Sequence, residues 1–301
     1  MNNKIILVLF MVSFLSPACV ANKSHEHSVA APAAQPSLNI AESRAMYLYS
    51  LARLQMIEGD LESALTLLRA AREADPNSAF LYTTEATIYL KMNRVKEALE
   101  ACDKALKLDP KFVDARVLAG NILAGMKNDK EAVVQFKKAL EIDPAKEEVY
   151  LQLAVSQVRI FEYEEAVSTL KELLKVVPDS ALGYYYLGKT YDQMKLSREA
   201  SNYYRKAIES KPDFEQAYID LGITLESQGE YNDAIATYKR LLEINPVNVS
   251  VIQHLVQLYI HQQSFEEALS LLNKITHSGL GGMETRRKIG LIYMELERYE
   301  D

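Results

Sequence analysis

The sequence predicts an all-α protein of repeated helix pairs, an α-solenoid. Prolines recur at a constant interval of 34 residues, and an alanine lies 12 residues before each proline. Between these columns, apolar residues recur at helical spacing in two separate runs per interval. Internal repetition at this period is typical of solenoids, whose units stack on their neighbours. The prolines are Pro76, Pro110, Pro144, Pro178, Pro212 and Pro246; the alanines are Ala64, Ala98, Ala132, Ala166, Ala200 and Ala234, with Ala268 next in register.

Residues 215–248 illustrate how one repeat predicts two helices. The apolar residues of 217–225 lie on one side of a first helix, and Gly229 then marks a turn. A second apolar stripe spans residues 231–242. Pro246 ends this second helix, because its ring disfavours the α conformation of the residue before it.

Small residues are expected where the two helices of a pair approach most closely. The alanine column would form one side of this contact. Glycine inside a helix costs roughly 1 kcal/mol relative to alanine, so packing is the reason we assign to it. The small residues of the first helices, which would form the other side, are Gly120, Gly188, Gly222, Gly290, Ala52, Ala86 and Ala154.

These columns resemble the tetratricopeptide repeat (TPR). The residues that carry the resemblance in one repeat are Tyr184, Leu187, Gly188, Tyr191, Ala200, Tyr204, Ala207 and Pro212. The resemblance implies a right-handed superhelix in which the first helices line a concave face. It also implies a solenoid over residues 41–301. Seven full repeats would start at Ala45, Ala79, Val113, Glu147, Ala181, Glu215 and Val249, and the first helix of an eighth at Met283.

The N-terminus is predicted to be an export signal over residues 1–18. Lys4 is followed by an apolar run over residues 5–15, which is shorter than the roughly 20 residues of a membrane-spanning helix. The residues before Cys19 resemble the lipobox of bacterial lipoproteins, although Ser16 stands where that motif has an aliphatic residue. The resemblance implies lipid attachment at Cys19 and, since Val20 follows, an outer-membrane address facing the periplasm.

Ordinary cleavage, after Ala18 or Ala21, is the alternative, and it would release a soluble periplasmic protein. Residues 19–40 are rich in Ala, Pro, Ser and Asn and lack an apolar period, which predicts a flexible linker. His25 and His27 in this linker have no third ligand nearby, so a metal site is not expected.

The composition argues against several function classes. The chain has 301 residues with a net charge of −7, whereas a general nucleic-acid binder normally shows a basic excess. Its two cysteines cannot form a disulfide framework, and Cys102 is expected to be a small buried hydrophobe. His254 and His261 are seven residues apart, about 10.5 Å along a helix, which is too far to share a metal ion. We therefore expect no enzyme, no cofactor and no metal.

The inward positions of the middle first helices are apolar. They predict a groove for a peptide segment, with Tyr185 and Tyr186 as anchors. The alternative is that these residues mainly pack against the neighbouring first helices. The predicted residues are Val117, Leu118, Leu151, Val155, Val158, Tyr185, Tyr186, Ile219 and Ile223.

A second mode that the family resemblance suggests is a clamp of Lys, Arg and Asn side chains for a C-terminal carboxylate. The corresponding positions here include Asn121, Gln152 and Tyr186, of which only Asn121 agrees. The carboxylate clamp is therefore predicted to be absent.

The expected function is a non-catalytic protein-interaction scaffold that binds a partner protein or peptide. With its lipid anchor it would belong to an envelope assembly of the pilus, outer-membrane or polysaccharide-export type. Neither nucleic acid nor a small-molecule substrate is expected. Two alternatives remain: a soluble periplasmic adaptor or chaperone-like binder, and the N-terminal part of a larger enzyme or regulator.

Overall fold

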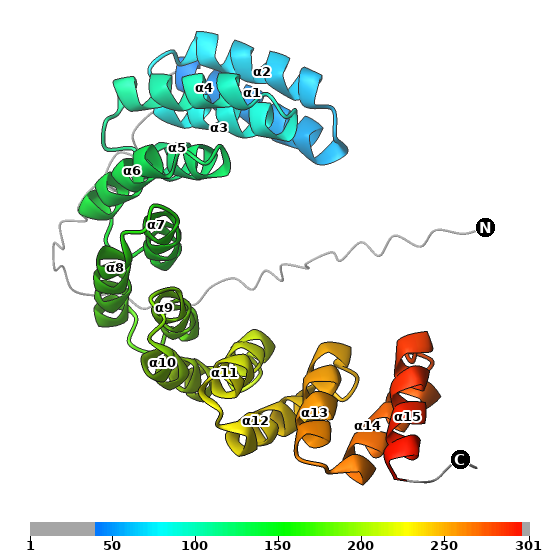
Figure 1. Ribbon diagram of the computed structural model, residues 1–301. Coiled ribbons are helices and arrows are strands. Elements are labelled where there is room, and N and C mark those ends of the chain that lie inside the picture. The colour runs from blue at the N-terminus through cyan, green and yellow to red at the C-terminus, as the bar shows by residue number, and fades with distance from the viewer. Residues whose placement is uncertain (1–39, 297–301) are drawn as a thin grey trace, which may run out of the picture. The chain divides into compact units, whose positions relative to one another are not determined.

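The computed structural model describes residues 40–296, which form fifteen α-helices and no strand (Figure 1). The predicted all-α solenoid is thereby confirmed. Odd-numbered helices are α1 (Ile40–Glu58), α3 (Ala79–Lys91), α5 (Val113–Gly125), α7 (Glu147–Arg159), α9 (Ala181–Gln193), α11 (Glu215–Gln228), α13 (Val249–His261) and α15 (Met283–Glu295). Even-numbered helices are α2 (Leu61–Ala74), α4 (Val95–Leu108), α6 (Asp129–Ile142), α8 (Tyr163–Val176), α10 (Ser197–Ser210), α12 (Tyr231–Ile244) and α14 (Phe265–His277).

Several sequence predictions lie outside the described residues. These are the signal over residues 1–18, the lipid attachment at Cys19, and nearly all of the linker with His25 and His27. The end of the eighth repeat, residues 297–301, lies outside them as well.

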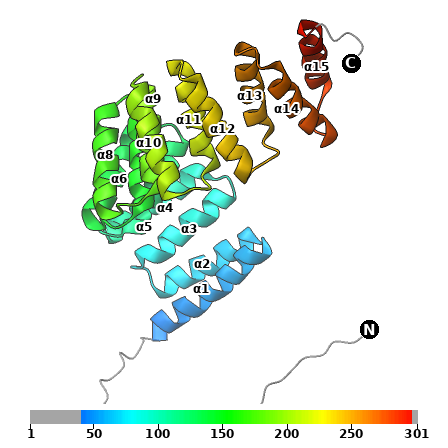
Figure 2. The same ribbon diagram turned by 90° about the horizontal axis from the view of Figure 1, so that it is seen from below.

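Within residues 40–296, each odd-numbered helix from α1 to α13 packs against the even-numbered helix that follows it, successive pairs stack on one another, and α15 packs against α14. The odd-numbered helices line the inner side of a curved row, and the even-numbered helices lie outside them (Figure 1). Figure 2 shows the same helices from below. From α3 onward, each odd-numbered helix begins 34 residues after the previous one. Helix α1 begins at Ile40, five residues before Ala45, where the repeat register would start it.

The helix ends follow from local chemistry. Four helices begin after a residue whose side chain accepts a hydrogen bond from a backbone N–H in the first turn. This bond satisfies a donor that the helix itself leaves unpaired. The four residues are Asp60, Ser78, Ser180 and Asn248. Even-numbered helices end before the proline column. Asp109, which precedes Pro110, has an extended backbone with φ −130° and ψ 97°.

The alanine column is completely buried. All seven alanines, from Ala64 to Ala268, have 0% exposed surface. We expected the glycines of the first helices to face this column, and the structure refines that expectation. A Cβ atom built on Gly120 would lie 2.5 Å from the ring of Phe136, and one on Gly188 would lie 2.6 Å from the ring of Tyr204. The glycines therefore make room for aromatic rings of the second helices.

Residue sizes in this contact are matched from repeat to repeat. Gly222 likewise faces the ring of Tyr238, so Gly120, Gly188 and Gly222 each face an aromatic residue sixteen positions later. Where the first-helix residue is alanine, the later residue is smaller or aliphatic: Ala86 is followed by Cys102 and Ala154 by Leu170, each pair sharing one buried cluster. The closest approach within a pair is thus a matched contact between a small residue and a large one.

Gly222→Ala should lower the free energy of unfolding by about 1–3 kcal/mol, because the added methyl group overlaps the Tyr238 ring. Combining it with Tyr238→Leu recreates the alanine–leucine pair of α7 and α8. The double variant should lose at least about 1 kcal/mol less free energy of unfolding than the two single variants lose when their losses are added. Gly125→Ala is the control, since nothing lies within 4 Å of a Cβ there. If urea unfolding shows that the losses of the two single variants simply add in the double variant, the two residues are not matched in size.

The turn inside each helix pair needs one residue in the left-handed conformation. The residue after it donates its N–H to the carbonyl oxygen five positions earlier, as Arg94 does to Tyr89 at 2.8 Å and Asn128 to Leu123 at 2.9 Å. Glycine or asparagine adopts this conformation at least cost. The residues in this column are Gly59, Asn93, Lys127, Phe161, Lys195, Gly229 and Gln263.

Phe161→Asn should stabilise the protein by about 0.5–1 kcal/mol, because Phe161 has φ 65° and is 75% exposed, so little packing is lost. Asn93→Phe makes the reverse change in the equivalent turn between α3 and α4, and it should destabilise the protein by a similar amount. Thermal and urea unfolding of the two variants check this. A loss of stability in Phe161→Asn would show that the exposed ring contributes more than the strain costs.

Candidate functional site

The nine sequence-predicted residues all lie on inner helices. Helix α5 carries two, α7 three, α9 two and α11 two. Eight of them are half-buried, and Ile223 is 43% exposed.

An apolar pocket of about 320 Å³ lies between α7 and α9. Its walls include Val155 and Val158 of α7 and the rings of Tyr185 and Tyr186 of α9. The structure thus brings together four of the nine predicted residues. The remaining lining residues are Ala154, Arg159, Lys189, Thr190 and Gln193.

The other five predicted residues do not line this pocket. Val117, Leu118, Leu151 and Ile219 pack against buried clusters of their own or neighbouring helix pairs. For these four residues the contacts agree with the alternative interpretation of the sequence, in which the inward apolar residues mainly pack within the protein.

Tyr185 is held in place at the pocket wall. Its hydroxyl donates a hydrogen bond to Asp220 Oδ2 at 2.8 Å, and its ring centroid lies 4.9 Å from that of Phe214 and 5.5 Å from that of Tyr186. Burial, and then the bond to Asp220, raise the pKa of Tyr185, so the hydroxyl stays a neutral donor. The pocket therefore has a rigid aromatic wall before any ligand enters.

Tyrosine hydroxyls also donate to two other acidic groups of α9 and α11. Tyr204 donates to Asp192 Oδ2 and Tyr238 donates to Glu226 Oε1, both at 2.6 Å. Burial, followed by these bonds, raises the pKa of both tyrosines. Asp220 accepts the hydroxyl of Tyr185 in the same way. These carboxylates of α9 and α11 are therefore acceptors for the protein's own side chains.

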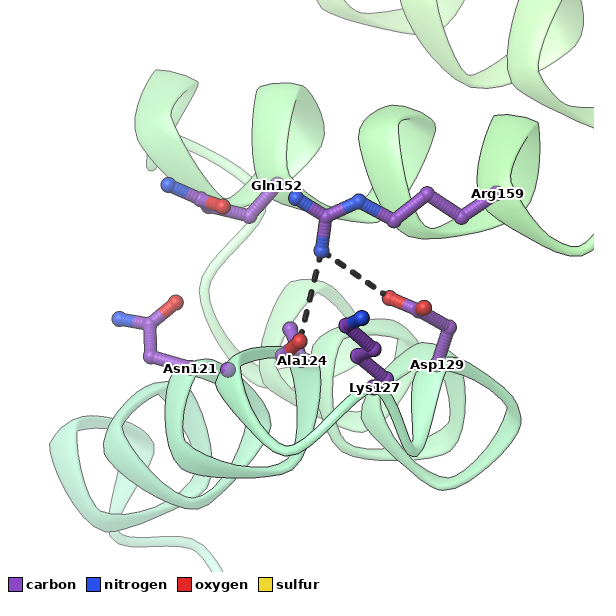
Figure 3. Close-up of a pocket in the computed structure, with 7 residues that line it drawn as sticks. Asn121, Ala124, Lys127, Asp129, Gln152 and Arg159 are labelled. Atoms are coloured by element: carbon purple, nitrogen blue, oxygen red, sulfur yellow. Dashed lines mark hydrogen bonds and ion pairs between the residues drawn. The ribbon is translucent and has the colours of Figure 1, made fainter.

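A second, polar pocket of about 770 Å³ lies between α5 and α7 (Figure 3). Arg159 Nη1 makes two long contacts there, to the Ala124 carbonyl oxygen at 3.4 Å and to Asp129 Oδ1 at 3.3 Å. The Asp129 side chain is only 8% exposed, whereas that of Arg159 is 52% exposed. The residues that line this polar pocket are Asn121, Ala124, Gly125, Lys127, Asp129, Gln152 and Arg159.

Sequence reasoning missed the cations of these pockets. Lys127 lies in the turn after α5 and Arg159 is the last residue of α7, so neither occupies an inward position within an apolar stripe. Lys189 of α9 was missed as well. Asn121 and Gln152, compared above with the carboxylate clamp, do line the polar pocket. For Lys127 and Arg159 a signal would have been their position at the end of a first helix: Lys127 lies two residues beyond α5, and Arg159 is the last residue of α7.

Within residues 40–296, no group of three or more His, Cys, Asp or Glu side chains is placed to hold a metal ion. His254 Nδ1 lies 2.9 Å from Glu226 Oε1, and His261 packs against the ring of Tyr231. Cys102 has 0% exposed surface, and burial raises its pKa to about 12, so its thiol is a poor nucleophile.

Among the helices between Ile40 and Glu295, none is both long enough and apolar enough to cross a membrane.

Sequence models of the tetratricopeptide repeat match most of this chain. The matches cover residues 55–120, 113–146, 148–180, 191–249 and 225–280. The chain therefore belongs to the tetratricopeptide repeat family, as its alanine, glycine and proline columns predicted.

Several solved structures share this fold. The MamA protein is 26% identical, with a TM-score of 0.52, over 57% of this chain and 94% of MamA. PilF of Pseudomonas aeruginosa is 21% identical, with a TM-score of 0.53, over 71% of this chain and 96% of PilF. YrrB, described as a TPR protein with an unusual peptide-binding site, is 21% identical, with a TM-score of 0.50, over 65% of this chain and 97% of YrrB.

Proposed function

We propose that this protein is a non-catalytic interaction scaffold that holds a segment of a partner protein against its inner helices. The observation that carries this proposal is the apolar pocket between α7 and α9. Its wall is rigid because Tyr185 is fixed by Asp220 and Phe214, and preorganised aromatic walls favour binding. The membership of the TPR family and the peptide-binding site described for YrrB support the same role.

The proposal includes export and a lipid tether. Its support is the apolar run over residues 5–15 and the motif before Cys19, followed by a linker that would separate the membrane from the helices. An anchored scaffold of this kind would organise an envelope assembly on its inner helices. The soluble periplasmic adaptor, and the N-terminal part of a larger enzyme or regulator, are the alternatives.

Site-specific photo-crosslinking in the native cells tests the binding role. A benzophenone amino acid at Val158, in the pocket, should form an adduct with a discrete partner. The same amino acid at Ser168, an exposed position of the outer helix α8, is the matched control. Introducing Tyr186→Ala and Val155→Ser should reduce the adduct at Val158 by about tenfold while circular dichroism shows the fold intact. Equal adducts from both positions, or an adduct that survives the pocket substitutions, would contradict the proposal.

The intact mass of the protein from the membrane fraction tests the tether. A mass of residues 19–301 plus acyl chains is expected. An unmodified mass starting at Cys19 or Asn22 in the soluble fraction would refute the anchor and favour the soluble adaptor. A mass well above 34.0 kDa would favour the larger enzyme or regulator.

A further inference from the structure

The two pockets of the inner helices are adjacent and share one residue. Arg159 of α7 lines both the polar pocket toward α5 and the apolar pocket toward α9. A single extended segment that crosses α7 can therefore occupy both pockets at once.

The charge in these pockets is opposite to that of the chain as a whole. The chain has a net charge of −7, but the two pockets are lined by Lys127, Arg159 and Lys189 and by one carboxylate, Asp129. Asp129 is nearly buried and is already in contact with Arg159. The accessible charge here is therefore positive.

Arg159 is placed to take an additional acceptor. Both of its contacts within the described residues are made by Nη1 and are long, at 3.3 and 3.4 Å. The other terminal nitrogen lies toward Gln152, and Asn121 and Lys127 border the same space (Figure 3). A guanidinium group has five N–H donors in a planar arrangement that suits a carboxylate.

We propose that the partner segment carries an acidic side chain, held by Arg159 and Lys127, two or three residues away from a large apolar side chain in the pocket of Val155, Val158, Tyr185 and Tyr186. This inference rests on the proposed function and specifies the chemistry of the partner. The spacing follows from the distance between neighbouring packed helices, about 8–10 Å, and from the advance of an extended chain, about 3.3 Å per residue.

A basic segment fits this surface poorly. Three acidic groups of α9 and α11, Asp192, Asp220 and Glu226, already accept tyrosine hydroxyls. Lys189 Nζ lies 3.4 Å from Asp220 Oδ2, which further offsets that charge. Charge complementarity therefore selects an acidic partner segment.

Binding of defined peptides to the whole protein tests the inference. The probes are fluorescent nine-residue peptides on a Gly/Ser background, with blocked ends, that carry Glu and Phe separated by one or two residues in either order. Matched peptides have Gln or Lys in place of Glu. At least one Glu peptide should bind about 3- to 10-fold more tightly than its Gln match, and the Lys peptide should bind most weakly. The preference should shrink in 0.5 M NaCl.

Substitutions assign the preference to residues. Arg159→Gln should abolish the discrimination between Glu and Gln, and Lys127→Gln should reduce it, while Arg198→Gln on the outer helix α10 should leave it unchanged. Val158→Ser should weaken the Glu and Gln peptides alike. Because Arg159 also contacts buried Asp129, its variant is first checked by thermal unfolding, and Lys127→Gln provides an independent test.

Several outcomes would overturn the inference. They are equal binding of Glu and Gln peptides, discrimination that persists in both cation variants, or no binding of any peptide at 1 mM. Tighter binding of a peptide that lacks Glu but ends in a free carboxylate would reassign the site to a chain terminus. Each of these results leaves the photo-crosslink at Val158 unaffected, so failure of the inference is distinguishable from failure of the proposed function.

Discussion

The contact between a small residue of the first helix and a large residue of the second is the constraint on which the rest of the structure depends. Gly120, Gly188 and Gly222 let the rings of Phe136, Tyr204 and Tyr238 approach to the backbone of the facing helix. The depth of this contact sets the separation of the two helices in a pair. It also fixes the rotation of each first helix, and with it the residues that face inward. The inner surface is therefore a consequence of packing on its opposite side.

Two of these rings also link packing to the polar chemistry of the inner helices. The hydroxyl groups of Tyr204 and Tyr238 donate hydrogen bonds to Asp192 and Glu226. Two carboxylates of the inner helices are therefore paired with buried aromatic side chains. Tyr185 does the same with Asp220. Around α9 and α11 the acidic charge is thus satisfied internally, whereas around α5 and α7 the cations Lys127 and Arg159 border an open pocket. The positive character of that pocket follows from how the acids are distributed.

The fold could be predicted from the sequence because its signals are local and repeated. The alanine column and Gly120, Gly188 and Gly222 mark contacts within a helix pair, the prolines mark helix ends, and the helices from α3 onward begin in this 34-residue register. The candidate site was only partly accessible to the same reasoning. Helical spacing finds inward positions such as Val155, Val158, Tyr185 and Tyr186. It does not tell which of them a neighbouring helix covers, as happens to Leu118 and Ile219. Arg159 lies at a helix end, where spacing along one helix gives no indication of a pocket shared with α5.

Hydrogen–deuterium exchange of the full chain, alone and with its crosslinked partner, tests most directly the claim that the inner helices are the binding surface. The account predicts slower exchange on binding around Lys127 in the turn after α5, around Arg159 at the end of α7, and around Lys189 within α9. Exchange at the outer helices α6, α8 and α10 should change little. Protection confined to the outer helices, or to α1 and α2, would contradict the claim.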